Sequence, residues 1–190
     1  MKGQSDLITT IVLVGVTIVI GVGLLAFAVP NISRLMAENS VKSALYEEQS
    51  NLIIYRELEN STTLCIGLLR ISPAYIAYSI AILDENLNSV ANPINIVKLP
   101  QYEGTLQQRL VTPPRRVYYL YSGVYYPIPG EIHVIEIPGG LISNYIERGR
   151  PLLLCIRKDV LRESVRMAKI FILASLNNNL YEVGRIYVYS

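Results

Sequence analysis

The stretch that decides the fold is LITTIVLVGVTIVIGVGLLAFAV, residues 7–29, which follows the short polar start MKGQSD, residues 1–6. The apolar run has no charged side chain over about 23 residues, so as a helix rising about 1.5 Å per residue it extends about 35 Å, enough to cross a bilayer. The sequence therefore predicts a membrane-competent N-terminal helix, and the remaining chain is the domain that this helix carries.

Two interpretations of this helix follow from length and composition. In a secretory signal peptide, small residues precede the cleavage site, and Ala26-Phe27-Ala28 before Val29 provides such a site. In an uncleaved single-span anchor, apolarity and length are sufficient. The flanking charges, Arg34, Glu38 and Lys42 among them, leave the orientation open.

A third interpretation rests on Lys2-Gly3 directly before Gln4-Ser5-Asp6 and the long apolar run. This start resembles the class III leader of archaeal type IV pilin-like proteins and archaellins. The resemblance implies that a membrane-bound prepilin peptidase cuts after Gly3, that Gln4 becomes the first residue, and that the apolar helix stays with the mature protein. It also implies assembly with copies of the same chain by an ATPase and platform machinery, with no enzymatic activity.

Beyond the apolar run, Pro30 has no N–H to donate, so it either kinks one long helix or ends the first helix and lets a second begin near Asn31. Leucines at positions 45, 52 and 58 with polar residues between them predict an amphipathic helical half over residues 31–59. Glu47 and Glu48 are interpreted as ordinary surface charges of this half. The expected organisation is a leader at 1–3, a helix at 4–59 and a β-rich extracytoplasmic domain at 60–190.

The rest of the chain predicts strands. Fourteen Tyr stand against two Phe and no Trp, and tyrosine suits a pleated surface with one packed face and one wet face. Turn signals separate the candidate strands, which cover residues 63–72, 74–83, 94–99, 116–126, 131–137, 151–157, 167–176 and 180–189. A short helix is expected at 158–166. The fold class is therefore α+β, a long N-terminal helix followed by a mainly antiparallel, sandwich-like β domain.

Three sets of residues are candidate modification or contact sites. Cys65 and Cys155 either form one disulfide, as an extracytoplasmic location allows, or remain two buried free thiols. Asn60-Ser61-Thr62 is a glycosylation sequon, as is Asn31-Ile32-Ser33. The candidate surface for subunit contact or adhesion is rich in tyrosine and comprises Tyr119, Tyr121, Tyr125 and Tyr126.

The sequence contains few features typical of nucleic-acid binding, metal binding or catalysis. A net charge of +2 with scattered basic residues predicts no nucleic-acid partner. His133 is the only histidine, which excludes a multi-histidine metal site, and Asp84-Glu85-Asn86 lacks the glycine and distal glutamate of a calcium loop. No nucleophile motif or phosphate loop is present. We expect no catalytic residue, no metal and no cofactor.

The leading hypothesis is a structural subunit of a type IV pilus-like surface filament that serves adhesion or motility. The first alternative is a singly anchored accessory ectodomain of a surface machine, resembling the stator-type components of the archaellum. The second is a binding protein or enzyme secreted after cleavage at Ala28. The first residue of the mature chain separates the three: Gln4, Met1 or Val29.

Overall fold

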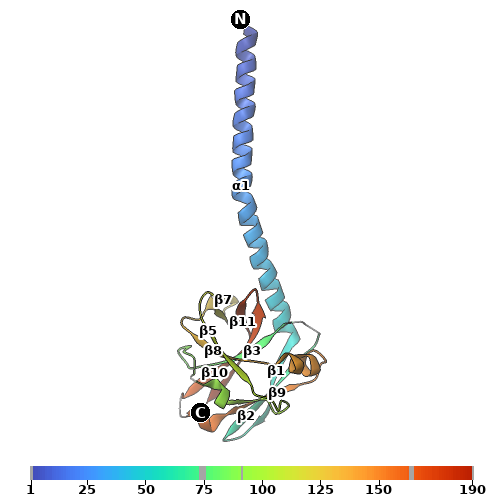
Figure 1. The fold of residues 1–190 in the computed structure, drawn as a ribbon, viewed down its shortest axis with the longest axis vertical. Helices are drawn as coiled ribbons and strands as arrows, with labels where there is room; N and C mark the ends of the chain where they lie inside the picture. Colours follow the sequence, from blue (N-terminus) through green and yellow to red (C-terminus); the bar gives the residue numbers. More distant parts are fainter. Residues whose placement is uncertain (1, 73–75, 91, 163–164, 190) are drawn as a thin grey trace. The chain divides into compact units, whose positions relative to one another are not determined.

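The computed structural model describes the chain over residues 2–72, 76–90, 92–162 and 165–189. Helix α1 (Lys2–Asn51) is followed by a β-rich region, and the chain divides into two compact units at Ala44 and Leu45. The described residues of the first unit are all helical, and the second unit begins with the last residues of α1 (Figure 1). The predicted α+β class is confirmed: a long apolar N-terminal helix precedes a mostly antiparallel β domain.

Helix α1 continues through Pro30 without ending. Pro30 has no N–H for the carbonyl one turn back, and the side-chain amide of Asn31 donates to the carbonyl oxygen of Phe27 at 2.8 Å. The carbonyl that loses its backbone donor at Pro30 is that of Ala26, so the Asn31 hydrogen bond lies next to the interruption and does not replace the missing bond.

The prediction that the helix extends to residue 59 is wrong. Helix α1 ends at Asn51, and Leu52 begins strand β1 (Leu52–Glu59), which pairs antiparallel with β2 (Thr63–Arg70). The sequence Leu-Ile-Ile-Tyr at the start of β1 is rich in β-branched and aromatic residues, which favour a pleated strand over a helix. Pairing with β2 outweighs the helical spacing of the leucines.

The β domain consists of two sheets. The first has the order β1-β2-β9-β4, where β4 is Val97–Lys98 and β9 is Leu152–Arg157. The second has the order β5-β8-β3-β10-β11-β6-β7. Its strands are β3 (Tyr78–Leu83), β5 (Gln107–Val111), β6 (Val117–Tyr121), β7 (Val124–Pro127), β8 (Ile132–Glu136), β10 (Met167–Leu176) and β11 (Asn179–Tyr189). All pairings are antiparallel except that of β6 with β11.

Two of the expected elements differ from those in the structure. The expected strand at 116–126 is a hairpin, because Ser122 and Gly123 have φ of 49° and 78° and turn the chain between β6 and β7. The expected strand at 94–99 is reduced to β4, because the 3₁₀ helix η1 (Pro93–Asn95) precedes it.

Some elements had no counterpart in the prediction, and one was predicted in part. The sequence did not indicate β5, nor the turns α2 (Gly139–Leu141) and η2 (Ile142–Ile146). The helix expected at 158–166 corresponds to α3 (Lys158–Arg162), and residues 163–164 lie outside the described chain.

Both faces of the central strands are packed, since every residue of β3 and most residues of β2 are buried. Leu64, Ile66 and Leu68 of β2 are fully buried, as are Ile80 and Ile82 of β3. A second cluster lies on the other face of the seven-stranded sheet and includes residues from both its central strand β10 and its outer strand β5, so this sheet curls around its own core. The cluster comprises Ala81, Leu83, Val111, Val117, Ile128, Ile132, Val134, Phe171, Leu173 and Leu180.

A disulfide joins Cys65 of β2 to Cys155 of β9, which lie directly opposite each other in the antiparallel pair. The two cysteines are 90 residues apart in the sequence. The structure therefore has the bonded form and not the two free thiols, and the bond closes a loop that contains most of the seven-stranded sheet.

A charged contact connects α3 to β1. Lys158 is 8% exposed, and its Nζ lies 3.0 Å from Oε1 of Glu59, while Nη1 of Arg56 lies 2.7 Å from Oε2. The hydrogen bond from Lys158 lowers the pKa of Glu59 below its ordinary value of 4.5, with the charges of Lys158 and Arg56 acting in the same direction against partial desolvation.

This contact predicts a pH dependence of stability. A carboxylate whose pKa is lowered by folding stabilises the folded state above its unfolded pKa, and the contribution is lost as the pH falls through the folded pKa. We expect the free energy of unfolding to fall less steeply below about pH 4.5 in Glu59→Gln than in the wild type, measured by denaturant unfolding from pH 7 to pH 3. The control is Glu57→Gln, because Glu57 is exposed and forms no ion pair within the described chain. Equal pH dependence in Glu59→Gln and the wild type would contradict the assignment.

Candidate functional site

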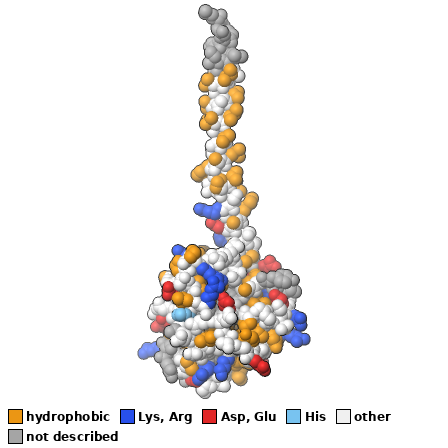
Figure 2. Space-filling model, viewed as in Figure 1, with side chains coloured by type: hydrophobic (Ala, Val, Ile, Leu, Met, Phe, Trp, Pro, Cys, Tyr) orange, Lys and Arg blue, Asp and Glu red, His pale blue; other side chains and the backbone are white. Residues whose placement is uncertain are grey.

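The first candidate site is the apolar surface of the N-terminal unit. From Ile11 to Val29 the large hydrophobic side chains are 51–75% exposed, and they occupy successive positions of the helix and so cover all its sides. Figure 2 shows them along the face of the helix that is in view. The mean hydropathy of this segment reaches 2.8. A helix that is hydrophobic all round is stable only where other apolar groups surround it, so this segment is compatible with membrane anchoring or with a signal sequence.

Polar groups within the segment bond inside the helix itself. The hydroxyl of Thr17 donates to the carbonyl oxygen of Leu13 at 2.8 Å. Such bonding satisfies the hydroxyl without water. The first ion pair of the described chain comes after the apolar run, between Arg34 and Glu38 at 3.4 Å, and both side chains are exposed. The apolar segment therefore ends where charge begins, near Arg34.

The glycines of this segment leave room for another helix. A Cβ atom at Gly15, Gly21 or Gly23 would meet nothing within 4 Å. Small residues on a membrane helix let a second backbone approach closely. The segment thus has both an apolar surface and positions for close helix packing.

The second candidate site is the buried end of α1, where Glu48 is 1% exposed. Arg70 of β2 binds it in a bidentate pair, with Nε to Oε1 at 3.0 Å and Nη2 to Oε2 at 2.7 Å. The hydroxyl of Tyr78, at the start of β3, donates to Oε1, and Nη1 of Arg70 donates to the carbonyl oxygen of Ser72. One carboxylate therefore ties the helix end to both sheets.

The interpretation of Glu48 as a surface charge is wrong. Its side chain shares a helix face with Leu45, which is 1% exposed, since i and i+3 positions align, and the apolar stripe of the sequence continues to Leu52, the 7% exposed first residue of β1. A carboxylate within that apolar stripe was the signal that could have predicted its burial. Arg70 gave no such signal, because its partner is 22 residues away in the sequence.

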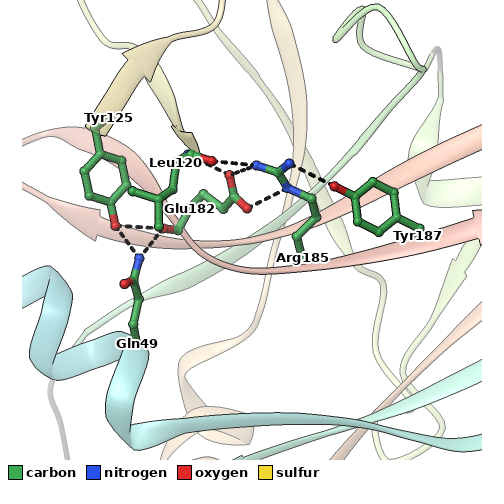
Figure 3. Close-up of polar contacts among 6 residues, drawn as sticks. All are labelled: Gln49, Leu120, Tyr125, Glu182, Arg185 and Tyr187. Atoms are coloured by element: carbon green, nitrogen blue, oxygen red, sulfur yellow. Dashed lines mark hydrogen bonds and ion pairs between the residues drawn. The ribbon is translucent and has the colours of Figure 1, made fainter. Parts of the chain in front are cut away.

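A third set of contacts joins α1 to the seven-stranded sheet through Gln49, Tyr125 and Glu182 (Figure 3). Nε2 of Gln49 donates to the hydroxyl of Tyr125 at 2.7 Å, and that hydroxyl donates to the backbone carbonyl of Glu182 at 2.9 Å. Burial raises the pKa of Tyr125, and the negative charge of Glu182 adds to the effect. The phenol is therefore neutral at physiological pH and keeps its proton for this hydrogen bond.

Glu182, which is buried, and Arg185, which is partly exposed, form an ion pair beside this contact (Figure 3), with Nε to Oε1 at 2.7 Å and Nη2 to Oε2 at 2.6 Å. Oε2 also accepts the N–H of Leu120 at 2.8 Å, and Nη1 of Arg185 donates to the hydroxyl of Tyr187 at 3.1 Å. Burial alone would lower the pKa of Arg185, but the hydrogen bonds with Glu182 raise it above its ordinary value.

A β-bulge makes the Glu182–Arg185 pair geometrically feasible. Along a regular strand, residues three apart face opposite sides of the sheet. Ile172 of β10 pairs with Gly184 and Leu173 pairs with Glu182, so Val183 is the extra residue. The bulge shifts the alternation by one and brings both charges to the same face.

The tyrosines expected to form a contact surface divide between two faces. Pairing of β6 with β7 places Tyr119 opposite Tyr126, and their ring centroids are 5.9 Å apart. Tyr121 and Tyr126 are 64% and 43% exposed, whereas Tyr119 is half-buried against the second core cluster. Tyr125 pairs with Leu120 and lies on the opposite face, in contact with α1. Only Tyr121 and Tyr126 are exposed at the surface.

The sequons differ in the availability of the asparagine side chain. Asn60 lies in the exposed turn between β1 and β2, where its Oδ1 accepts the N–H of Thr62 at 2.9 Å and of Thr63 at 2.7 Å. The Nδ2 of Asn31 donates within α1 instead. Glycosylation of Asn60 stays a prediction.

The remaining residues considered in the sequence are those of the expected cleavage site and the single histidine. Gly3 and Gln4 lie near the start of α1. The side chains of residues 1–8 lie outside the part of the chain that the structure describes, so cleavage after Gly3 stays a prediction. Nδ1 of His133 lies 3.0 Å from Nε2 of Gln108. Among the described residues, no group of three or more His, Cys, Asp or Glu side chains could hold a metal ion.

No protein-family description, no curated protein and no solved structure matches this chain.

Proposed function

We propose that the chain is a non-enzymatic structural subunit of a type IV pilus-like surface filament, with its β domain outside the cell. The observation that carries this proposal is the apolar surface of residues 11–29, which is exposed on all sides of the helix. Such a surface requires lipid before assembly and neighbouring helices after it, because exposing it to water is costly. Copies of the same helix supply apolar surroundings of matching length.

The composition of the helix supports a packed bundle. Gly15, Gly21 and Gly23 leave space for a second backbone. The many β-branched residues are mediocre helix formers in water, yet in an apolar environment the helix is the conformation that satisfies the backbone of a single span.

The attachment of the β domain also suits a filament subunit. A filament under tension transmits force from its helical core to the exposed domains through the end of each helix. Here that end is held by the buried Glu48–Arg70 pair and by the hydrogen bond from Gln49 to Tyr125. The Cys65–Cys155 disulfide links β2, which carries Arg70, to β9.

A singly anchored accessory ectodomain is the second candidate, because about 23 apolar residues match one bilayer crossing. The test is the N-terminal sequence and intact mass of the native protein, together with its presence in filaments sheared from cells. For a filament subunit we expect Gln4 as the first residue and recovery in the sheared fraction. Met1 as the first residue and absence from sheared filaments would favour the anchor, and Val29 with a protein soluble in the medium would favour a secreted protein.

A variant at the expected cleavage site tests the filament proposal more directly. Gly3→Val places a branched side chain at the expected cleavage site, so we expect the unprocessed chain to accumulate in the membrane and the filaments to disappear. The matched control is Gly139→Val, because a Cβ atom at Gly139 meets nothing within 4 Å and the residue is far from the leader in the sequence. Normal filaments in Gly3→Val cells would contradict the proposal.

A further inference from the structure

A hollow of about 280 Å³ lies at one end of the curled seven-stranded sheet, between the loop before β6 and the chain that follows β7. We call it the basic hollow, because its charged lining residues are Arg115 and Arg116 and no acidic side chain lines it. Pro113 and Pro129 also line the hollow, and both are exposed.

The basic hollow also has apolar walls. Four residues that line it, Val111, Val117, Ile128 and Ile132, belong to the second core cluster and are 2–4% exposed. These side chains are held by the packing of that cluster and form the buried floor of the hollow, and the exposed apolar lining residues are Pro113, Pro127 and Pro129. The hollow is thus basic and apolar at once.

Arg115 lacks the partners that a partly buried arginine needs. Its Nε is buried with no hydrogen-bond acceptor among the described residues, and Nη2 reaches the hydroxyl of Ser175 only at 3.4 Å. Burial lowers the pKa of Arg115, and the positive charge of Arg109 adds to that effect. The nearby carboxylate of Glu136 already pairs with Arg109 at 3.3 Å.

Arg116 is fixed through its backbone while its side chain stays exposed. Its N–H donates to Oδ1 of Asn179 at 2.9 Å, and its carbonyl oxygen accepts the N–H of Leu180 at 2.9 Å. In the described chain its guanidinium group pairs with no carboxylate, unlike that of Arg70 or Arg185. Two arginines whose guanidinium groups have no carboxylate partner among the described residues therefore line one hollow.

We infer that the basic hollow binds a small organic carboxylate, whose charge pairs with Arg115 and Arg116 and whose compact apolar body contacts Pro113, Pro127 and Pro129. Guanidinium groups bind carboxylates through charge-assisted hydrogen bonds, often in bidentate geometry. An anion in the hollow supplies the negative charge that Arg115 lacks. The apolar walls select against a bare inorganic anion, because such an anion gains nothing from covering them.

The test uses the full chain in detergent micelles and 4-fluorobenzoate as the probe, with binding followed by ¹⁹F NMR and by calorimetry. We expect saturable binding to the wild type. We expect affinity to fall at least about tenfold in Arg115→Gln and in Arg116→Gln, because each loses a charged hydrogen-bonding partner. The matched control is Arg148→Gln, which removes an exposed arginine that does not line the hollow.

Three comparison compounds define the ligand class: 4-fluorobenzyl alcohol, benzoate and inorganic phosphate. A variant is compared only if its far-ultraviolet circular dichroism spectrum matches that of the wild type, which establishes that it is folded. We expect 4-fluorobenzyl alcohol, which has the same ring without the charge, to bind at least about tenfold more weakly than the probe. Equal binding of the alcohol, displacement by inorganic phosphate at the same concentration as by benzoate, or unchanged affinity in both arginine variants would overturn the inference.

Discussion

Replacing Glu48 with alanine is expected to lower the free energy of unfolding by about 3–5 kcal/mol, because breaking a buried ion pair leaves the other charge uncompensated. Glu48 and Arg70 are 1% and 4% exposed, so water cannot replace the lost carboxylate. Tyr78, itself 1% exposed, loses its acceptor in the same variant. The measurement is chemical denaturation of the full chain in detergent, followed by the near-ultraviolet circular dichroism of its tyrosines.

The adjacent residue provides a matched control. Glu47 is exposed, and Glu47→Ala removes the same charge from the same helix turn. We expect this substitution to alter the free energy of unfolding by no more than about 0.5 kcal/mol. Equal effects of the two substitutions would show that Glu48 is not the buried partner of Arg70.

A double-mutant cycle separates the pair from general damage. If the single variants Glu48→Ala and Arg70→Ala are costly because each leaves a buried charge, the double variant should cost clearly less than the sum of the two. Additive effects would mean that the two residues do not interact. The Glu48–Arg70 pair would then not be the main connection between the end of α1 and the sheets.

Removal of the disulfide is the second large effect. In Cys65→Ala/Cys155→Ala we expect the free energy of unfolding to fall by about 4 kcal/mol, because a bond across 90 residues restricts the unfolded chain strongly. Both half-cystines lie on paired strands, so the folded geometry requires no rearrangement when the bond is absent. Denaturant midpoints of the oxidised wild type and the double variant measure the difference.

Reduction gives an independent control for this prediction. The wild type treated with a thiol reductant should unfold at the same denaturant concentration as the double variant, while the double variant should not respond to the reductant. A wild type whose midpoint is unaffected by full reduction would contradict a stabilising role for the bond between Cys65 and Cys155.

These effects concern the domain that the helix carries, and they leave the apolar surface of residues 11–29 unchanged. A Glu48 variant that folds weakly but still enters the membrane would separate the two parts of the proposed function. The helix supplies the apolar contacts for assembly, and its buried end connects those contacts to the β domain.

The sequence by itself determined the features that depend on neighbours along the chain. Residues 7–29 predict an apolar helix because length and lack of charge suffice, and residues 167–176 predict strand β10 because apolar β-formers run between turn signals. The α+β class follows from these local patterns.

The tertiary structure alone determined the conformation of segments in which pairing over long sequence distances competes with local preference. Residues 52–59 carry helical leucine spacing but become β1, because the hydrogen-bond ladder with β2 is available only in the fold. The apolar stripe around Glu48 could have indicated that it is buried, but its partners Arg70 and Tyr78 come within bonding distance only in the fold. The extra residue Val183 is visible only against β10. Ion pairs, bulges and strand pairing depend on partners far away in the sequence, and only the folded chain brings those partners together.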